Sequence, residues 1–231
     1  MTAPDPAGTK PILELRDVVA TRAGAPVDLV LRPGELVLVD AELPANETAL
    51  VDVALGLATP LGGSVRFRGF VWDELPPVFA DALRGRVGLV PRRGGWVPEL
   101  STMANVLLQA RYHRRTPGRV LADRAERLAN RFFLPGVPLD AVDAMHPRDR
   151  LRAACVRAFL ADPVLVIVET PVIGGWGSLV PPLVETIQEV RDAGGAVVWF
   201  LTESDLFDEP SLPADRRLRL VGASRGQGAL S

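Results

Sequence analysis

Short runs of apolar and mostly β-branched residues, separated by Gly or Pro turns, open the chain and predict β-strands. They cover residues 12–19, 27–31 and 35–40. After the third run comes a short loop, and residues 47–57 then carry apolar side chains at helical spacing. Asn46 is a suitable N-cap for this helix. The pattern therefore predicts a strand, a loop and a helix in direct succession.

The middle of the chain changes from strand patterns to helical patterns. Residues 62–72 indicate a further strand or a hairpin, and residues 86–90 indicate another strand. Helical patterns follow over residues 101–115, 118–133 and 147–161, with few strand signals between them. We interpret this stretch as a helical insert in a domain that otherwise contains strands.

The last third of the chain returns to strands, now of the kind that lies inside a sheet. Residues 163–170 form a continuous apolar run, which is typical of a parallel strand that is buried on both faces. Residues 183–195 predict a helix that ends at a glycine, and residues 196–201 and 216–221 predict two more strands. Strands that alternate with helices imply an α/β fold with a parallel sheet and an inserted helical subdomain.

Composition and charge narrow the class of protein. Of the 231 residues, 48% are hydrophobic and 23% are charged, as in folded globular proteins. The longest apolar runs, 164–168 and 196–201, are shorter than the roughly 20 residues of a membrane-spanning helix, and the first residues do not form a secretory signal. The net charge of −2 gives no general attraction to nucleic acid. Cys155 is the only cysteine, and His113 and His146 have no neighbours at metal-ligand spacing, so we expect a cytoplasmic protein without a metal site.

Three longer segments resemble, in order and spacing, segments of the nucleotide-binding subunits of ATP-binding cassette (ABC) transporters. They are residues 56–69, 87–108 and 157–171, and the resemblance spans about residues 11–222. It implies a P-loop NTPase-like α/β sheet with an antiparallel β subdomain and an inserted α-helical subdomain. The expected parts are a flexible tail at 1–10, a cassette core at 11–96 and 162–231, and a helical subdomain at 97–161.

The loop after the third predicted strand departs from the family's phosphate-binding loop. That loop uses glycines, whose backbone N–H groups surround a phosphate, and a lysine that neutralises the phosphate oxygens. Ala41, Pro44 and Asn46 stand where the resemblance places glycines, and Glu47 stands in place of the lysine. Pro44 has no N–H, Glu47 reverses the sign of the charge, and the only lysine, Lys10, precedes the predicted strands. Without the resemblance, the loop is an ordinary connection in which Glu47 suits the first turn of a helix.

Other positions at which the family holds its nucleotide differ as well. The nucleotide-sensing glutamine, the signature motif, the magnesium-binding aspartate, the catalytic glutamate and the switch histidine all fall on other residue types. A shift of one residue would instead make Glu169 the catalytic carboxylate, and Thr48 together with Glu169 could still hold magnesium. The glutamine position holds Arg92, and the signature positions hold Met145, His146, Pro147 and Arg148. The aspartate position holds Glu169, the catalytic glutamate position holds Thr170, and the histidine position holds Glu203.

These differences predict that the chain is not an enzyme but a pseudo-ATPase, with no required cofactor and at most weak Mg-ATP binding. The resemblance then implies a structural or regulatory partner of an integral membrane permease at the inner face of the membrane, as a homodimer or paired with another cassette subunit. Residues 105–115 are faintly similar to cassettes of MCE-type lipid-transport systems, which indicates lipid transport. Two alternatives stay open: a divergent ATPase in which Arg92 or an arginine of a partner supplies the missing positive charge, and a soluble interaction protein that retains only the fold.

Large apolar residues before and within the first helix of the insert are candidates for permease docking. In the resembled family this segment lines the groove that receives a short coupling helix of the permease. Packing against the helical insert explains the same residues equally well, so docking and core roles both stay open. The candidates are Trp96, Val97, Leu100 and Met103.

Overall fold

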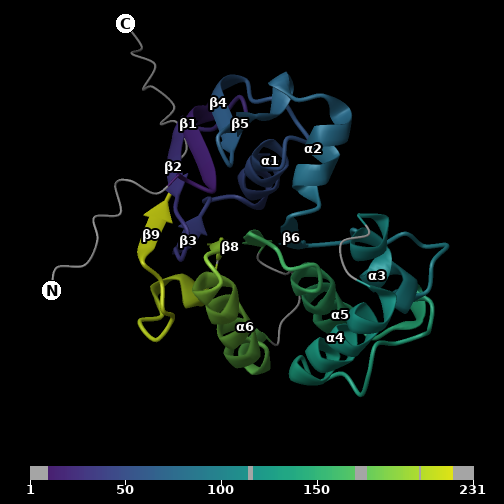
Figure 1. The fold of residues 1–231 in the computed structure, drawn as a ribbon. Coiled ribbons are helices and arrows are strands. Elements are labelled where there is room, and N and C mark those ends of the chain that lie inside the picture. Colours follow the sequence, from purple (N-terminus) through teal and green to yellow (C-terminus); the bar gives the residue numbers. More distant parts are fainter. Residues whose placement is uncertain (1–9, 114–116, 170–175, 203, 221–231) are drawn as a thin grey trace, which may run out of the picture.

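The protein is built from a parallel sheet, an antiparallel sheet and a group of helices (Figure 1). The computed structural model describes residues 10–113, 117–169, 176–202 and 204–220. The expected tail at 1–10 therefore lies, except for its last residue, outside the described residues. None of the helices in the described part of the chain has the length and the apolar character that crossing a membrane requires.

Within the described residues, the parallel sheet contains five strands, and they confirm the predictions made from the apolar runs. Every neighbouring pair in this sheet is parallel. Because the carboxyl ends of parallel strands share one edge, the residues that follow these strands come together there. Across the sheet the order is β6 (Val87–Val90), β7 (Leu165–Val168), β8 (Ala196–Phe200), β3 (Leu36–Asp40) and β9 (Arg216–Arg219).

Four strands form the antiparallel sheet, which covers one side of helix α1 (Pro44–Ala54). Apolar side chains of α1 pack in the same core as those of this sheet and of one face of the parallel sheet, so α1 lies between the two sheets (Figure 1). The order of the antiparallel strands is β2 (Val27–Leu31), β1 (Leu13–Val19), β4 (Gly62–Phe67) and β5 (Phe70–Val71).

The inner strands of the parallel sheet, β7, β8 and β3, are buried on both faces, as their continuous apolar runs predict. Successive residues of a strand point to opposite faces, and in β8 Val197 and Trp199 pack in one core while Val198 and Phe200 pack in the other. All five residues of β8 are buried. The sheet is therefore the central layer, with a separate hydrophobic core on each side.

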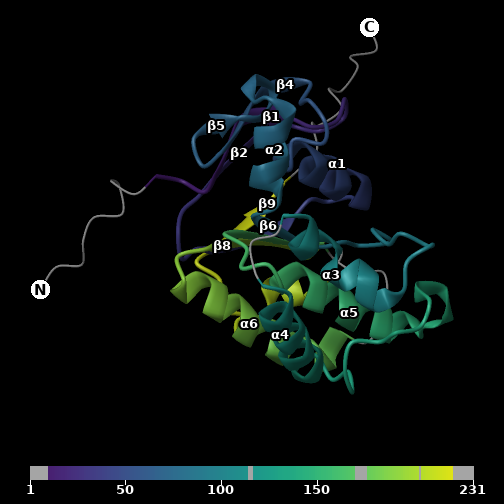
Figure 2. The same ribbon diagram turned by 45° about the vertical axis from the view of Figure 1, so that its right-hand side comes forward.

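Helices cover the face of the parallel sheet that points away from α1 (Figure 2). The helices α3 (Thr102–Tyr112), α4 (Gly118–Arg131) and α5 (Pro147–Phe159) contact one another, and α5 also packs against β6. They form the helical subdomain, so the predicted α/β fold class is confirmed. The remaining helical elements are α2 (Pro77–Arg84), α6 (Val180–Asp192), and the short 3₁₀ turns Trp72–Glu74, Val142–Ala144, Trp176–Ser178 and Asp205–Asp208.

One local prediction was wrong, and one helix was not predicted. Helix α1 begins at Pro44 with Leu43 at its N-cap, so Asn46 is not the cap. Proline suits the first helical position because that position needs no N–H donor, and the Asn46 amide instead donates to the carbonyl oxygen of Ala41 and accepts from the Thr21 hydroxyl, both at 3.3 Å. Helix α2 has no counterpart among the predicted elements, because its eight residues are too few to show a clear period.

Candidate functional site

Three of the predicted nucleotide-site residues meet at the carboxyl edge of the parallel sheet. Glu47 is in the first turn of α1, which follows β3. Arg92 lies two residues after β6, and Glu169 directly follows β7. The structure thus brings together positions that are far apart in the sequence, at the edge where parallel α/β sheets place their ligands.

A buried ion pair joins Glu47 to Arg92. The distance between Nη2 of Arg92 and Oε2 of Glu47 is 2.6 Å. The side chain of Glu47 is fully buried, and that of Arg92 is 15% exposed. The Nε–H group of Arg92 is buried and has no hydrogen-bond partner among the described residues. The guanidinium therefore neutralises Glu47 and keeps one donor unused.

Glu169 adds a second carboxylate to this cluster. Its Oε2 accepts a hydrogen bond of 2.9 Å from the backbone N–H of Arg92. Burial raises the pKa of the Glu169 carboxyl above its ordinary value, and the charge of Glu47 raises it further, against the lowering effect of the Arg92 N–H. The cluster thus contains one guanidinium and two carboxylates, and the carboxyl of Glu169 has a raised pKa.

Replacing Glu169 with Gln is expected to stabilise the protein increasingly as the pH rises. A carboxyl whose pKa is raised on folding favours the folded state below its ordinary pKa of 4.5, and this contribution is lost as the pH rises through the folded value. Gln can still accept the Arg92 N–H bond and carries no charge. Melting temperatures measured across acidic to neutral pH should show a gap between Glu169→Gln and the wild type that closes toward acid. A gap that is constant with pH would contradict this.

The loop before α1 does not form a phosphate cradle in this structure. The N–H of Glu42 donates to Oδ1 of Asp40 at 3.0 Å, and the N–H of Leu43 donates to the carbonyl of Ala41 at 2.6 Å. The N–H groups of Asn46 and Glu47 both donate to the carbonyl of Leu43. Since Pro44 has no N–H and the carboxylate of Glu47 is turned to Arg92, the described residues do not fit a triphosphate held in the manner of a P-loop.

The other predicted nucleotide-site residues lie in several settings. Thr48 is exposed, and the structure places no third ligand with Glu169, since no group of three His, Cys, Asp or Glu side chains in the described part of the chain could hold a metal ion. Met145 is buried, and its Sδ accepts a hydrogen bond from the Thr102 hydroxyl. Thr170 and Glu203 lie outside the described residues.

The positions that correspond to the signature motif form the start of α5. His146 is the N-cap, and its Nδ1 accepts a hydrogen bond of 3.2 Å from the N–H of Arg148. Pro147 takes the first helical position. His146, Pro147 and Arg148 are all exposed, so this helix start is open to solvent.

One cleft is lined by residues for which the sequence predicts different roles. Its volume is 510 Å³, and its lining includes Arg92 of the charged cluster, Trp96 of the docking candidates and Pro147 of the signature positions. Trp96 is half-buried, packs against the core and lies under the guanidinium of Arg157, which is 4.4 Å from its ring. Trp96 therefore also has a structural role.

A buried asparagine that the sequence did not reveal fixes the segment of the docking candidates. The side chain of Asn105 accepts from the N–H of Val97 at 2.8 Å and donates to the carbonyls of Val97 at 3.0 Å and Leu100 at 3.1 Å. Val97 is 38% exposed, whereas Met103 packs partly against the core. The structure thus leaves Val97 as the most accessible of these side chains.

Exposed apolar residues beside this segment mark a groove that sequence reasoning missed. Two connected hollows of 260 and 410 Å³ share Gly95, Gln109 and Arg157. Leu57 lines the first hollow and is 62% exposed. Leu108 and Tyr112 line the second and are 45% and 69% exposed. Their spacing of four residues on α3 was the available signal, since it puts both on one face of a helix.

Comparisons with known proteins agree with the fold. The chain is 29% identical over 210 residues to the ribose import ATP-binding protein RbsA 1 of Streptomyces coelicolor, over 86% of this chain and 40% of that protein. It is 28% identical over 146 residues to the lipoprotein-releasing system ATP-binding protein LolD of Hydrogenovibrio crunogenus, over 63% of each. A solved dimeric ATP-binding cassette, in a post-hydrolysis state bound to ADP and Pi, matches 90% of this chain and 94% of its own with a TM-score of 0.75 at 17% identity. No protein-family profile matches the chain.

These relatives correct the expectation that the chain is not an enzyme. They are named as ATP-binding proteins of import and release systems. The inference from missing motif residues is therefore at odds with the similar proteins. The chain spans 40% of the length of the ribose import protein, so the activity of the whole relative does not transfer directly.

Proposed function

We propose that this chain, an ATP-binding cassette by sequence relationship and by fold, is the ATP-binding subunit of a membrane transporter. The observation that carries the proposal is the arrangement of two sheets and a helical subdomain, which is shared over 90% of the chain with a dimeric cassette. Relatives named for ribose import and for lipoprotein release support a role in transport. The partner is an integral membrane permease, and the cassette pairs with a second copy or with another cassette.

Mg-ATP binds weakly in this proposal, as in a divergent ATPase, at the carboxyl edge of the parallel sheet. Arg92 is the positive group at that edge, and its unused Nε–H is a donor for a phosphate oxygen. Its pairing with Glu47 opposes binding, because at 4 Å and an effective dielectric of 20 two unit charges interact with about 4 kcal/mol. The nucleotide therefore has to draw Arg92 away from Glu47. Heat denaturation with and without Mg-ATP tests this part of the proposal.

The permease docks in the groove lined by Leu57, Leu108 and Tyr112. These three side chains are exposed although they are large and apolar, and the hollows between them are open to a helix or loop of a partner. Val97, in the segment before α3, is a further exposed apolar residue of this part of the chain. The cargo class that we propose, a lipid, rests on residues 105–115 alone.

Replacing Leu108 with Glu is expected to release the chain from its permease without a change in melting temperature. Leu108 is 45% exposed, so the added charge stays in solvent in the free chain and becomes buried only in the complex. The tagged chain, purified in mild detergent from membranes of cells that express it natively, should retain an integral membrane protein, and the variant should lose most of it. Leu139→Glu is the matched control, because Leu139 is 71% exposed outside the groove. Equal retention by the two variants would exclude this docking surface.

A further inference from the structure

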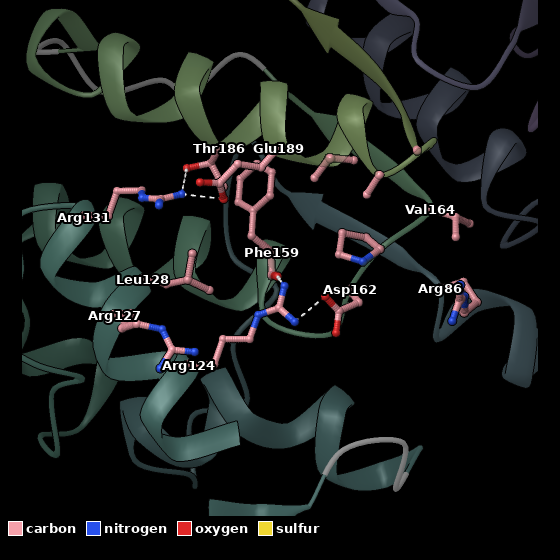
Figure 3. Close-up of a pocket in the computed structure, with 14 residues that line it drawn as sticks. Arg86, Arg124, Arg127, Leu128, Arg131, Phe159, Asp162, Val164, Thr186 and Glu189 are labelled. Atoms are coloured by element: carbon pink, nitrogen blue, oxygen red, sulfur yellow. Dashed lines mark hydrogen bonds and ion pairs between the residues drawn. The ribbon is translucent and has the colours of Figure 1, made fainter. Parts of the chain in front are cut away.

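Figure 3 shows a further pocket, which lies at the edge of the parallel sheet opposite to the charged cluster of Glu47, Arg92 and Glu169. Its volume is 490 Å³, which is within the range of small-molecule sites. Its lining includes Arg86, Val164 and Gly195. These are the residues directly before β6, β7 and β8, respectively. Because amino ends and carboxyl ends of parallel strands lie at opposite edges, this pocket is separate from the candidate nucleotide site. It is independent of the proposed function.

Arginines dominate the lining of the pocket. Arg124, Arg127 and Arg131 project from successive turns of α4, and Arg86 reaches it from the start of β6 (Figure 3). The lining also contains two carboxylates, Asp162 and Glu189, so its net charge is +2. The whole chain has a net charge of −2, so positive charge is concentrated in this pocket.

Two of the four guanidinium groups form ion pairs with carboxylates of the same chain. Arg131 donates to Oε2 of Glu189 at 2.7 Å, and Arg124 pairs with Asp162 and donates to the carbonyl of Phe159 at 3.1 Å (Figure 3). The side chains of Glu189 and Asp162 are 61% and 65% exposed, so both carboxylates lie at the rim. These pairs orient the two guanidinium groups at the mouth of the pocket.

The other two guanidinium groups have no such partner. The Nε–H of Arg86 is buried without a hydrogen-bond partner among the described residues. Arg127 is exposed and makes no hydrogen bond or ion pair with any residue that the structure describes. A buried donor without a partner is unfavourable unless a ligand or water satisfies it. The pocket therefore offers unused guanidinium donors that suit the oxygens of an anion.

Apolar side chains form the floor between the arginines. Phe159 and Leu128 are 1% and 7% exposed, and Figure 3 shows the Phe159 ring between the α4 arginines and α6. A simple inorganic anion would leave this apolar surface uncovered. A ligand that combines an anionic group with an apolar body would use both features.

We propose that this pocket binds a small organic phosphate, with Arg86 and Arg127 as phosphate ligands and Phe159 and Leu128 beneath the organic part. Arg guanidinium groups match the geometry of phosphate oxygens through paired hydrogen bonds. The bound phosphate would link α4 of the helical subdomain to the amino ends of the sheet strands. It would thus join the two parts of the molecule far from the nucleotide edge.

Calorimetric titration of the full chain with phenyl phosphate and with inorganic phosphate, without magnesium, tests the site. The two probes carry the same dianionic group, so the apolar floor should make phenyl phosphate bind more tightly, at one site per chain. Arg127→Gln and Arg86→Gln should each weaken phenyl phosphate binding by about tenfold or more. Neither change breaks a described ion pair, so both variants should fold, which their melting temperatures check.

Two controls separate this pocket from other positive surfaces. Arg119→Gln changes an exposed arginine of α4 outside the pocket and should leave binding unchanged. Arg93→Gln changes an exposed arginine next to the nucleotide edge and outside the pocket, and it should also leave binding unchanged. Binding of phenyl phosphate that Arg127→Gln and Arg86→Gln do not weaken, equal binding of the two probes, or the absence of binding to the wild type would each overturn the proposal.

Discussion

Replacing Arg92 with Ala is expected to lower the melting temperature more than any other single change considered for this protein. The variant leaves the fully buried carboxylate of Glu47 without its guanidinium. Removing one partner of a buried ion pair costs about 3–5 kcal/mol. For a chain of this size, that corresponds to a fall of roughly 6 to 20 °C. Scanning calorimetry measures the shift directly.

Two further variants show whether the loss comes from the ion pair. Arg93→Ala removes the neighbouring exposed arginine and should melt with the wild type. The double variant Glu47→Leu with Arg92→Leu replaces both charges by apolar groups and should recover much of the stability, as buried pairs often do when replaced together. If Arg92→Ala melts within a degree or two of Arg93→Ala, the buried pair does not contribute as described.

Replacing Gly88 with Ala is expected to give the second-largest effect. Strand β6 passes so close to α5 that an added Cβ at Gly88 would lie 2.1 Å from the carbonyl oxygen of Ala158. The oxygen belongs to the backbone of α5, and the position of a Cβ is fixed by the backbone of its own strand, so the helix has to move away from the sheet. Such overpacking costs about 3 kcal/mol, or roughly 6 to 12 °C in melting temperature.

Gly118→Ala is the matched control for the Gly88 variant. A Cβ at Gly118 meets nothing within 4 Å, and the residue is in α4, where Ala favours the helix. This control should melt at or slightly above the wild-type temperature. If Gly88→Ala behaved like it, the close approach of α5 to β6 would be wrong, and with it the position of the His146 helix start relative to Arg92.

The sequence predicted the fold from the periods of its apolar residues. The continuous run at 163–170 became β7, and the alternation of strands and helices became the parallel sheet, because a strand buried on both faces tolerates few polar residues. Short elements and exact helix starts could not be predicted in this way. Helix α2 has eight residues, and the start of α1 is decided by Pro44 rather than by the polar residue two positions later.

The candidate site was predictable as a set of positions but not as a set of contacts. Resemblance assigned Glu47, Arg92 and Glu169 to one nucleotide site, and the structure places all three at one sheet edge. That Arg92 pairs with Glu47, 45 residues away, depends on the rotamer of a long side chain and leaves no pattern in the sequence. The arginine pocket was not predictable either, because its lining comes from separate parts of the chain: the start of β6, helix α4, the turn after α5, and helix α6.

The Glu47–Arg92 pair makes the central claim directly testable, because it predicts which change strengthens Mg-ATP binding. Heat denaturation of the wild type and of Glu47→Gln is compared with and without the same high concentration of Mg-ATP. A ligand at 100 times its dissociation constant adds about 2.7 kcal/mol of stability, which is a rise of roughly 5 to 10 °C for a chain of this size. We predict a small rise for the wild type and a clearly larger one for Glu47→Gln, whereas the exposed control Glu74→Gln should match the wild type. No rise in either protein, or equal rises in both, would contradict the account of a nucleotide edge held closed by Glu47 and Arg92.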